Sequence, residues 1–126
     1  MRLSSVELGD VVVAAPSGSI NHPNAQELQQ ALAPILTRAA AGRTAVVLDF
    51  SGIDYISSMG LRVLMMAAKQ MRAGDGRIVV AALQPVVQEI FDIARFRHVL
   101  EVFPTVRDAL QAISAASLET YDRLHP

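Results

Sequence analysis

Cysteine and tryptophan are both absent from this 126-residue chain. A chain without thiols has no disulfide, no thiolate ligand for a metal and no cysteine nucleophile. The three histidines, His22, His98 and His125, are scattered, and no two of them have a spacing typical of metal ligands. We therefore expect neither a metal site nor another cofactor.

Motifs of catalysis and nucleotide binding are also absent. The sequence has no G-x-S-x-G nucleophile elbow, no Walker A loop and no dinucleotide-binding fingerprint. The segment Gly74-Asp75-Gly76 is better explained as a turn that ends a helix than as a phosphate loop. We therefore expect a protein that is not an enzyme.

Long apolar runs and a strong charge of either sign are missing as well. No apolar run approaches the roughly 20 residues that a membrane helix needs, and the N-terminal MRLSSVELGD lacks the apolar core of a signal peptide. The formal net charge is −1, which argues against a nucleic-acid binder that works through a broad basic surface. We expect a cytoplasmic protein that neither inserts into a membrane nor binds nucleic acid directly.

Hydrophobic residues make up 52% of the chain, and they follow two different periods. Strand patterns cover residues 3–8, 11–15, 44–50, 77–83 and 99–103. Helical spacing covers residues 25–42, the segment after residue 58, a short segment from residue 85 and residues 105–121. Alternating strands and helices predict a single α/β domain with about four helices and parallel strand pairing. We place its core at about residues 3–118 and a C-terminal tail at about 119–126.

Local signals refine the first third of the chain. Gly9-Asp10 predicts a hairpin turn, and residues 16–18 (PSG) predict a bend or bulge in the following strand. Asn24 with Glu27 three residues later predicts a capping box at the start of the first helix. Pro34 is expected to kink that helix or to weaken one of its turns.

The most informative feature is the serine pair Ser57-Ser58, which lies between a strand pattern and a helix pattern. A helix N-terminus gathers unpaired N–H groups and partial positive charge. The two hydroxyls therefore suit a helix cap, an anion site or a phosphorylatable serine, and the local pattern leaves the three open. Asp49 and Asp54 flank the turn, and we expect them to cap and solvate the strand end.

Residues 48–64, LDFSGIDYISSMGLRVL, resemble the signature of the STAS domain, as found in bacterial anti-sigma factor antagonists. Three other segments resemble the family in the same order, namely GSIN at 18–21, PVVQEIFD at 85–92 and VFPTVRDAL at 102–110. The resemblance covers nearly the whole chain. It implies a short βα superhelix on a mixed, mostly parallel sheet.

The resemblance also implies an anti-sigma factor antagonist that works by partner switching. In that mechanism the antagonist binds an anti-sigma factor of the histidine-kinase-like serine kinase type, is phosphorylated by it and dissociates. A serine phosphatase then restores the antagonist. The family's phosphorylated serine lies two residues before the glycine of the motif, here Gly60, so it corresponds to Ser58, with Ser57 as a secondary candidate. The alternative is a stand-alone STAS subunit or scaffold of a transporter or signalling assembly.

The acidic residues around the acceptor are where this chain departs from the family pattern. Ser57 and Asn21 stand where the family usually has acids, and Met59 stands where it has Ser or Thr. The hydroxyl of Ser58 is retained, and a phosphate on it would oppose docking because its charge must be desolvated. The partner surface implied by the resemblance consists of Asn21, His22, Asn24, Ser57, Ser58, Met59, Gly60 and Arg62.

Overall fold

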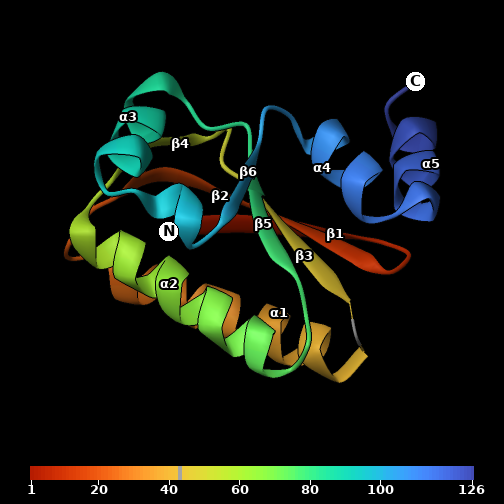
Figure 1. The fold of residues 1–126 in the computed structure, drawn as a ribbon, viewed down its shortest axis with the longest axis horizontal. Helices are drawn as coiled ribbons and strands as arrows, with labels where there is room; N and C mark the ends of the chain where they lie inside the picture. Colours follow the sequence, from red (N-terminus) through yellow and green to blue (C-terminus); the bar gives the residue numbers. More distant parts are fainter. Residues whose placement is uncertain (43) are drawn as a thin grey trace.

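Six strands and five α-helices make up the part of the chain that the computed structural model describes, residues 1–42 and 44–126 (Figure 1). The strands are β1 (Arg2–Leu8), β2 (Val11–Ile20), β3 (Ala45–Asp49), β4 (Ile53–Ile56), β5 (Ile78–Ala81) and β6 (Glu101–Phe103). The helices are α1 (Ala25–Gly42), α2 (Ser58–Ala73), α3 (Pro85–Ile93), α4 (Val106–Ile113) and α5 (Ala115–Leu124), and a short 3₁₀ turn, η1, spans Phe96–His98.

The strands form one mixed sheet in the order β1-β2-β3-β5-β6. Strands β1 and β2 form an antiparallel hairpin, and the pairs β2–β3, β3–β5 and β5–β6 are parallel. Strand β4 pairs in parallel with the last residues of β2, and the register of this pairing shifts between Gly18 and Ser19. The two halves of β2 therefore hold different partners, β3 beside its first half and β4 beside its end.

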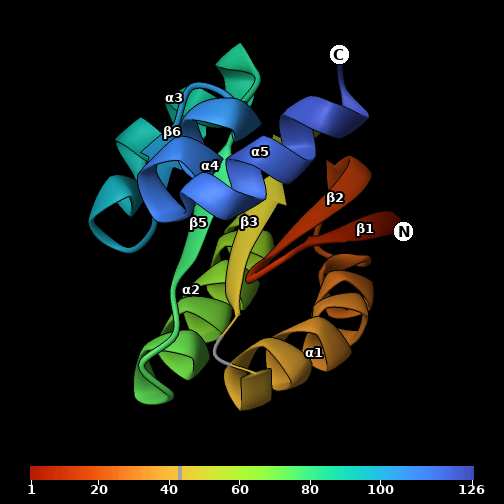
Figure 2. The same ribbon diagram turned by 90° about the vertical axis from the view of Figure 1, so that its right-hand side faces the viewer.

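Helices cover both faces of this sheet, with α1 and α2 on one face and α4 and α5 on the other (Figure 2). Successive residues of a strand point to opposite faces. Val46, Leu48 and Val80 accordingly belong to the larger core under α1 and α2, whereas Val47 and Val79 belong to the smaller core under α4. Burial on both faces explains why β3 and β5 are continuous apolar runs.

The α/β architecture with a mixed, mostly parallel sheet is confirmed. The hairpin at Gly9-Asp10 is also present, with Gly9 at a φ of 65°. The predicted bulge lies at Gly18, whose φ of 104° is in a region that glycine tolerates better than other residues. Helix α1 continues through Pro34, whose exposed ring lies away from the core.

Strand β4 is absent from the sequence-based assignment, in which no element covers residues 51–56. The strand has only four residues, and its two inner positions, Asp54 and Tyr55, are both exposed. A run this short shows no clear period, so tertiary pairing with β2 decides its conformation. The strand ends at Ile56 and leads directly into Ser57.

The single final helix predicted over residues 105–121 is wrong, because the chain forms two helices that are separated at Ser114. Ser114 has extended backbone angles, φ −158° and ψ 115°, and its Oγ accepts a hydrogen bond from the N–H of Ser117 at 3.2 Å. The same hydroxyl donates to Asp10 Oδ1 at 2.7 Å, which attaches the break to the β1–β2 turn. Residues 119–124, assigned from the sequence to a tail, belong to α5.

Two contacts hold α5 in place. Leu118 and Tyr121 pack against the smaller core. Arg107 of α4 donates two hydrogen bonds to the carboxylate of Asp122, at 3.1 and 3.2 Å. The hydrogen bonding and the charge of Asp122 raise the pKa of the Arg107 guanidinium above its ordinary value.

Replacing Ser114 by alanine should lower the free energy of unfolding by about 1 kcal/mol, because α5 loses its cap. Urea unfolding followed by circular dichroism measures the change. Gln111→Ala, at an exposed position of α4, is the matched control and should change stability by less than about 0.5 kcal/mol. An equal effect of both substitutions would contradict the capping role of Ser114.

Candidate functional site

Ser57 is the N-cap of α2. Its backbone is extended, with φ −84° and ψ 169°, and its Oγ accepts a hydrogen bond from the N–H of Gly60 at 3.2 Å. Its own N–H donates to the carbonyl of Ile20 at the end of β2, at 2.7 Å. Ser57 thus performs the capping role that the sequence left open between the two serines.

Ser58 is the first residue of α2, and it is exposed. Within the described part of the chain, its hydroxyl takes part in none of the side-chain hydrogen bonds. The neighbouring Met59 is 37% exposed. Ser57 caps the helix, and Ser58 is exposed beside it at the positive end of α2.

Gly60, another of the predicted partner residues, is buried in the first turn of α2. A Cβ atom at this position would come within 2.6 Å of Ile20 Cγ2 and 2.7 Å of Ile56 Cγ1. These two side chains belong to the ends of β2 and β4. The glycine therefore lets the first turn of α2 approach both strand ends, and this approach positions the two serines.

The loop from Asn21 to Asn24 lies next to the serine turn and is closed by reciprocal hydrogen bonds. The N–H of Asn21 donates to Asn24 Oδ1 at 2.8 Å, and the N–H of Asn24 donates to Asn21 Oδ1 at 3.1 Å. Asn24 Nδ2 also donates to the carbonyl of Ser19 at 2.7 Å. The predicted capping box is therefore wrong, since the Asn24 side chain turns back into the loop and Glu27 pairs with the amino group of Met1.

A shallow groove of about 400 Å³ joins this loop to the start of α2. It brings together His22 and Met59, two of the predicted partner residues. Arg62 is exposed one turn further along α2, and Asn24 is half-buried at the base of the loop. The sequence analysis missed the rest of the lining, which comprises Pro23, Ala25, Gln26, Gln29 and Val63. The helical spacing of Met59 to Val63 and of Gln26 to Gln29 is the signal that could have revealed them.

The carboxylates near the turn are engaged elsewhere. The Ser19 hydroxyl donates to Asp54, and the N–H of Ser51 donates to Asp49 Oδ1 at 3.0 Å. This agrees with their predicted role at the strand end. Helix α2 itself contains no acidic residue, and Asp54 of β4 is the acidic residue nearest to the serines in the sequence.

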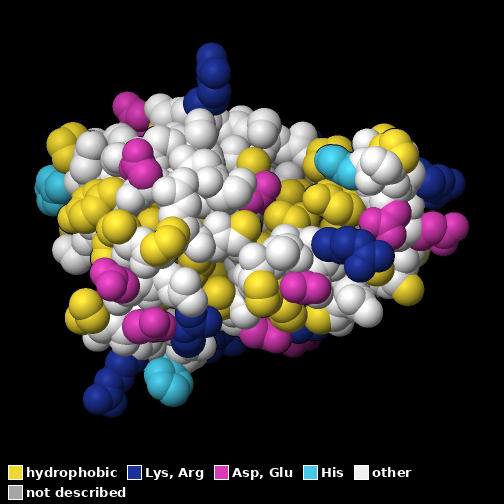
Figure 3. Space-filling model, turned by 90° about the horizontal axis from the view of Figure 1, so that it is seen from above, with side chains coloured by type: hydrophobic (Ala, Val, Ile, Leu, Met, Phe, Trp, Pro, Cys, Tyr) yellow, Lys and Arg dark blue, Asp and Glu magenta, His cyan; other side chains and the backbone are white. Residues whose placement is uncertain are grey.

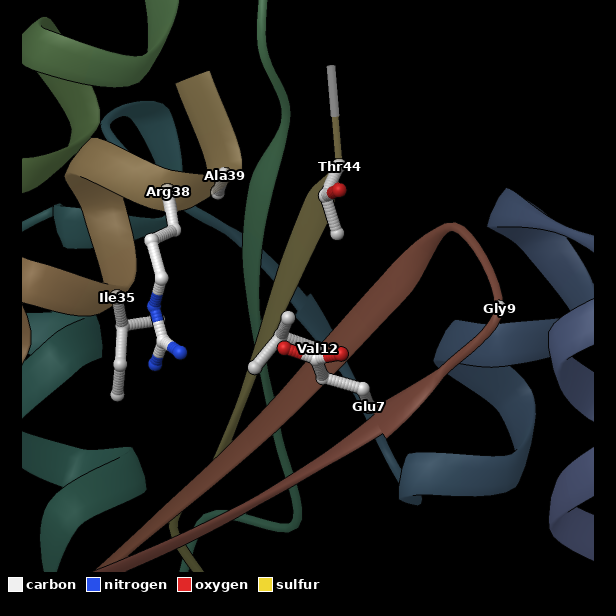
Figure 4. A pocket seen from close by; sticks show the side chains of 7 residues that line it. All are labelled: Glu7, Gly9, Val12, Ile35, Arg38, Ala39 and Thr44. Atoms are coloured by element: carbon white, nitrogen blue, oxygen red, sulfur yellow. The ribbon is translucent and has the colours of Figure 1, made fainter. Parts of the chain in front are cut away.

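Other features of the described residues add no second chemical site. No group of three or more His, Asp or Glu side chains in residues 1–42 and 44–126 could hold a metal ion. A separate hollow of about 80 Å³ lies between the β1–β2 hairpin and the end of α1, where Glu7 and Arg38 approach from opposite sides (Figure 4). It contains none of the predicted site residues. None of the helices in this part of the chain has the length and apolar character needed to cross a membrane.

The family model of the STAS domain matches residues 2–109. The chain belongs to the STAS domain family. The match spans the serine turn, the Asn21–Asn24 loop and α3, so it includes every residue assigned to the candidate site.

Relatives of this STAS chain have similar length. BtrV of Bordetella bronchiseptica, provisionally named an anti-sigma factor antagonist, is 38% identical over 116 residues, which cover 92% of this chain and 94% of BtrV. The crystal structure of a protein from Thermotoga maritima, provisionally named an anti-sigma factor antagonist, has a TM-score of 0.79 at 17% identity, covering 88% of this chain and 93% of the other. The unphosphorylated form of SpoIIAA, also an anti-sigma factor antagonist, has a TM-score of 0.71 at 17% identity, with 89% and 96% covered. At these identities, the two structures support the fold alone.

The two serines should respond differently to alanine. Ser57→Ala should lower the free energy of unfolding by about 1 kcal/mol, because the N–H of Gly60 loses its acceptor. Ser58→Ala should change it by less than about 0.5 kcal/mol, because the exposed hydroxyl makes no contact that stabilises the fold. Urea unfolding of both variants checks this, and a larger loss for Ser58→Ala would contradict the assignment of the cap.

Gly60→Ala tests the close approach of α2 to the strand ends. The added methyl group must displace Ile20 and Ile56, and overpacking of this kind costs about 1–3 kcal/mol, partly offset by the better helix propensity of alanine. The control is Gly74→Ala, because a Cβ there would make only an ordinary contact of 3.7 Å with Ala40. Thermal unfolding should show a lower midpoint for Gly60→Ala than for Gly74→Ala, and the reverse order would contradict the packing argument.

Proposed function

We propose that this STAS protein is an anti-sigma factor antagonist that is switched by phosphorylation of Ser58. The observation that carries the proposal is that the two serines differ in their contacts. Ser57 caps α2 through its Oγ, and Ser58 presents an unengaged hydroxyl to solvent one residue later. The name of BtrV, a relative at 38% identity, supports the same function.

The partner is an anti-sigma factor of the histidine-kinase-like serine kinase type, which docks on the surface around Ser58. The exposed residues available to it are Asn21, His22, Ser58, Met59 and Arg62. Met59 offers an adaptable apolar contact, and Arg62 offers a cation to an acidic group of the partner. The N-terminus of α2 lies in the middle of this surface, so a kinase that docks there meets the Ser58 hydroxyl that it phosphorylates.

Phosphorylation of Ser58 changes docking without disturbing the fold. The phosphate adds close to two negative charges at the N-terminus of α2, where the helix dipole stabilises them. The cap at Ser57 remains in place, so the helix need not rearrange. A partner that covers this surface must desolvate the phosphate, and the complex therefore dissociates. A serine phosphatase then restores the antagonist, and the cycle takes place in the cytoplasm.

The family usually has acidic residues at the positions of Ser57 and Asn21. Their absence affects recognition by the kinase more than the ability of Ser58 to accept a phosphate. Asn21 keeps the loop closed by hydrogen bonds to Asn24, so the shape of the docking surface is retained without a carboxylate. Ser57 is the weaker candidate for phosphorylation. Its oxygen already accepts a hydrogen bond from the N–H of Gly60, and the residue is only half-exposed. SpoIIAA, which shares the fold, has been solved in both unphosphorylated and phosphorylated forms.

Incubation with each histidine-kinase-like anti-sigma factor encoded by the source genome, together with ATP and Mg²⁺, tests the proposal. Intact mass spectrometry should show the addition of one phosphate to the wild-type protein and to Ser57→Ala, and none to Ser58→Ala. Binding of the phosphorylated protein to the same anti-sigma factor should be weaker by about 100-fold or more, as expected for a buried uncompensated charge.

Two results would contradict the proposal. One is a chain that neither binds nor is phosphorylated by any of these kinases. The other is phosphorylation that persists in Ser58→Ala. Recovery of a transporter or signalling assembly in place of a kinase, by affinity purification from the source organism, would favour the alternative of a stand-alone STAS subunit or scaffold.

A further inference from the structure

Helix α3 presents an apolar row to solvent. Ile93 is 84% exposed and Val86 is 53% exposed, and with half-buried Ile90 they lie on one face of the helix, because residues three, four and seven apart are neighbours. The opposite face of the helix, with Val87 and Phe91, is the buried one. Hydrophobic and acidic side chains lie side by side at the end of the molecule that carries α3 (Figure 3).

An acidic row runs beside these apolar residues. Glu89 and Asp92 are both exposed, and Asp92 pairs with Arg97 at 2.7 Å. Glu89 takes part in none of the ion pairs of the described residues. The outward face of α3 is therefore an apolar ridge with a free carboxylate along one side.

A trough of complementary character lies between α1 and α2. Its volume is about 300 Å³, and the side chains that line it are uncharged. They are Gln29, Leu32, Ala33, Leu36, Val63, Met66, Ala67 and Gln70. Met66 is 46% exposed, so an apolar surface is open to solvent along the trough.

One rim of this trough is basic. Arg62 and Lys69 lie four residues before and three residues after Met66, so helix geometry places them beside it on the solvent side of α2. Both are exposed, and neither takes part in an ion pair within residues 1–42 and 44–126. The facing rim on α1 carries Gln26, Gln30 and Thr37, which are uncharged. The trough therefore matches an apolar helix with carboxylates along one side.

We propose that a second copy of this chain seats its α3 in the α1–α2 trough. Val86 and Ile93 would replace solvent over Val63 and Met66, and Glu89 would face the rim of Arg62 and Lys69. The contact must join two molecules, because within one chain α3 packs against β4 and η1, away from the trough (Figure 1). It is head-to-tail, since the two surfaces differ. This self-association goes beyond the antagonist function.

Sedimentation velocity of the full chain at roughly 10 µM to 1 mM measures the association. The wild-type protein should show a concentration-dependent rise in sedimentation coefficient. Ile93→Ser, Lys69→Glu and Glu89→Lys should each weaken association about tenfold or more, because they remove the apolar contact or oppose like charges. Glu119→Lys, at an exposed position of α5, is the matched charge control and should associate as the wild type does.

Mixing the charge-reversed variants gives the sharper test. In a mixture of Lys69→Glu and Glu89→Lys, the Glu89 of the first variant meets the unchanged Arg62 and Lys69 of the second, which restores the wild-type contact between the two. The mixture should therefore associate more tightly than either variant alone. A wild-type protein that stays monomeric at every concentration, an Ile93→Ser variant that associates normally, or a mixture that stays monomeric would each overturn the proposal. Because no kinase or ATP is present, this result is independent of the test of Ser58.

Discussion

The close approach of α2 to the ends of β2 and β4 is the constraint on which the site depends. Gly60 has no room for a Cβ between Ile20 and Ile56, so the first turn of the helix rests directly on the two strand ends. The N–H of Ser57, bonded to the carbonyl of Ile20, fixes the same junction through the backbone. These contacts fix the position of the first turn of α2, and with it the position of the two serines.

The sequence predicted those parts of the structure that depend on the periodicity of apolar residues and on the residue types that favour turns. Burial on both faces makes β3 and β5 continuous apolar runs, and glycine at positive φ marks the hairpin and the bulge, so both were recognisable. The four-residue β4 was not, because its conformation comes from pairing with β2 rather than from its own pattern. The break at Ser114 was missed since a serine fits a helix surface and a cap equally well, and its bond to Asp10 joins residues 104 positions apart.

For the site, the motif spacing identified the serine turn but did not assign a role to each hydroxyl. That assignment required the backbone angles of Ser57 and the acceptor of its hydrogen bond, both of which depend on where α2 begins. An Asn side chain at position 24 could form hydrogen bonds either within the loop or with the N-terminus of α1. The loop geometry selects Asn21 and Ser19 as its partners. The groove beside Met59 combines residues of α1 and α2 and becomes visible only when the two helices are packed together.

The divided pairing of β2 has a consequence for local stability. Strand β4, which leads into the serine turn, pairs with β2 through only three residue pairs, Gly18–Ile53, Ser19–Tyr55 and Ile20–Ile56, and the register shifts after the first of them. The central ladders between β2, β3 and β5 do not pass through this segment. We therefore expect the pairing of β4 with β2 to open at a lower free energy than the central ladders. Amide protons of β4 would then exchange with solvent before those of β3, although the two strands are only a few residues apart in the chain.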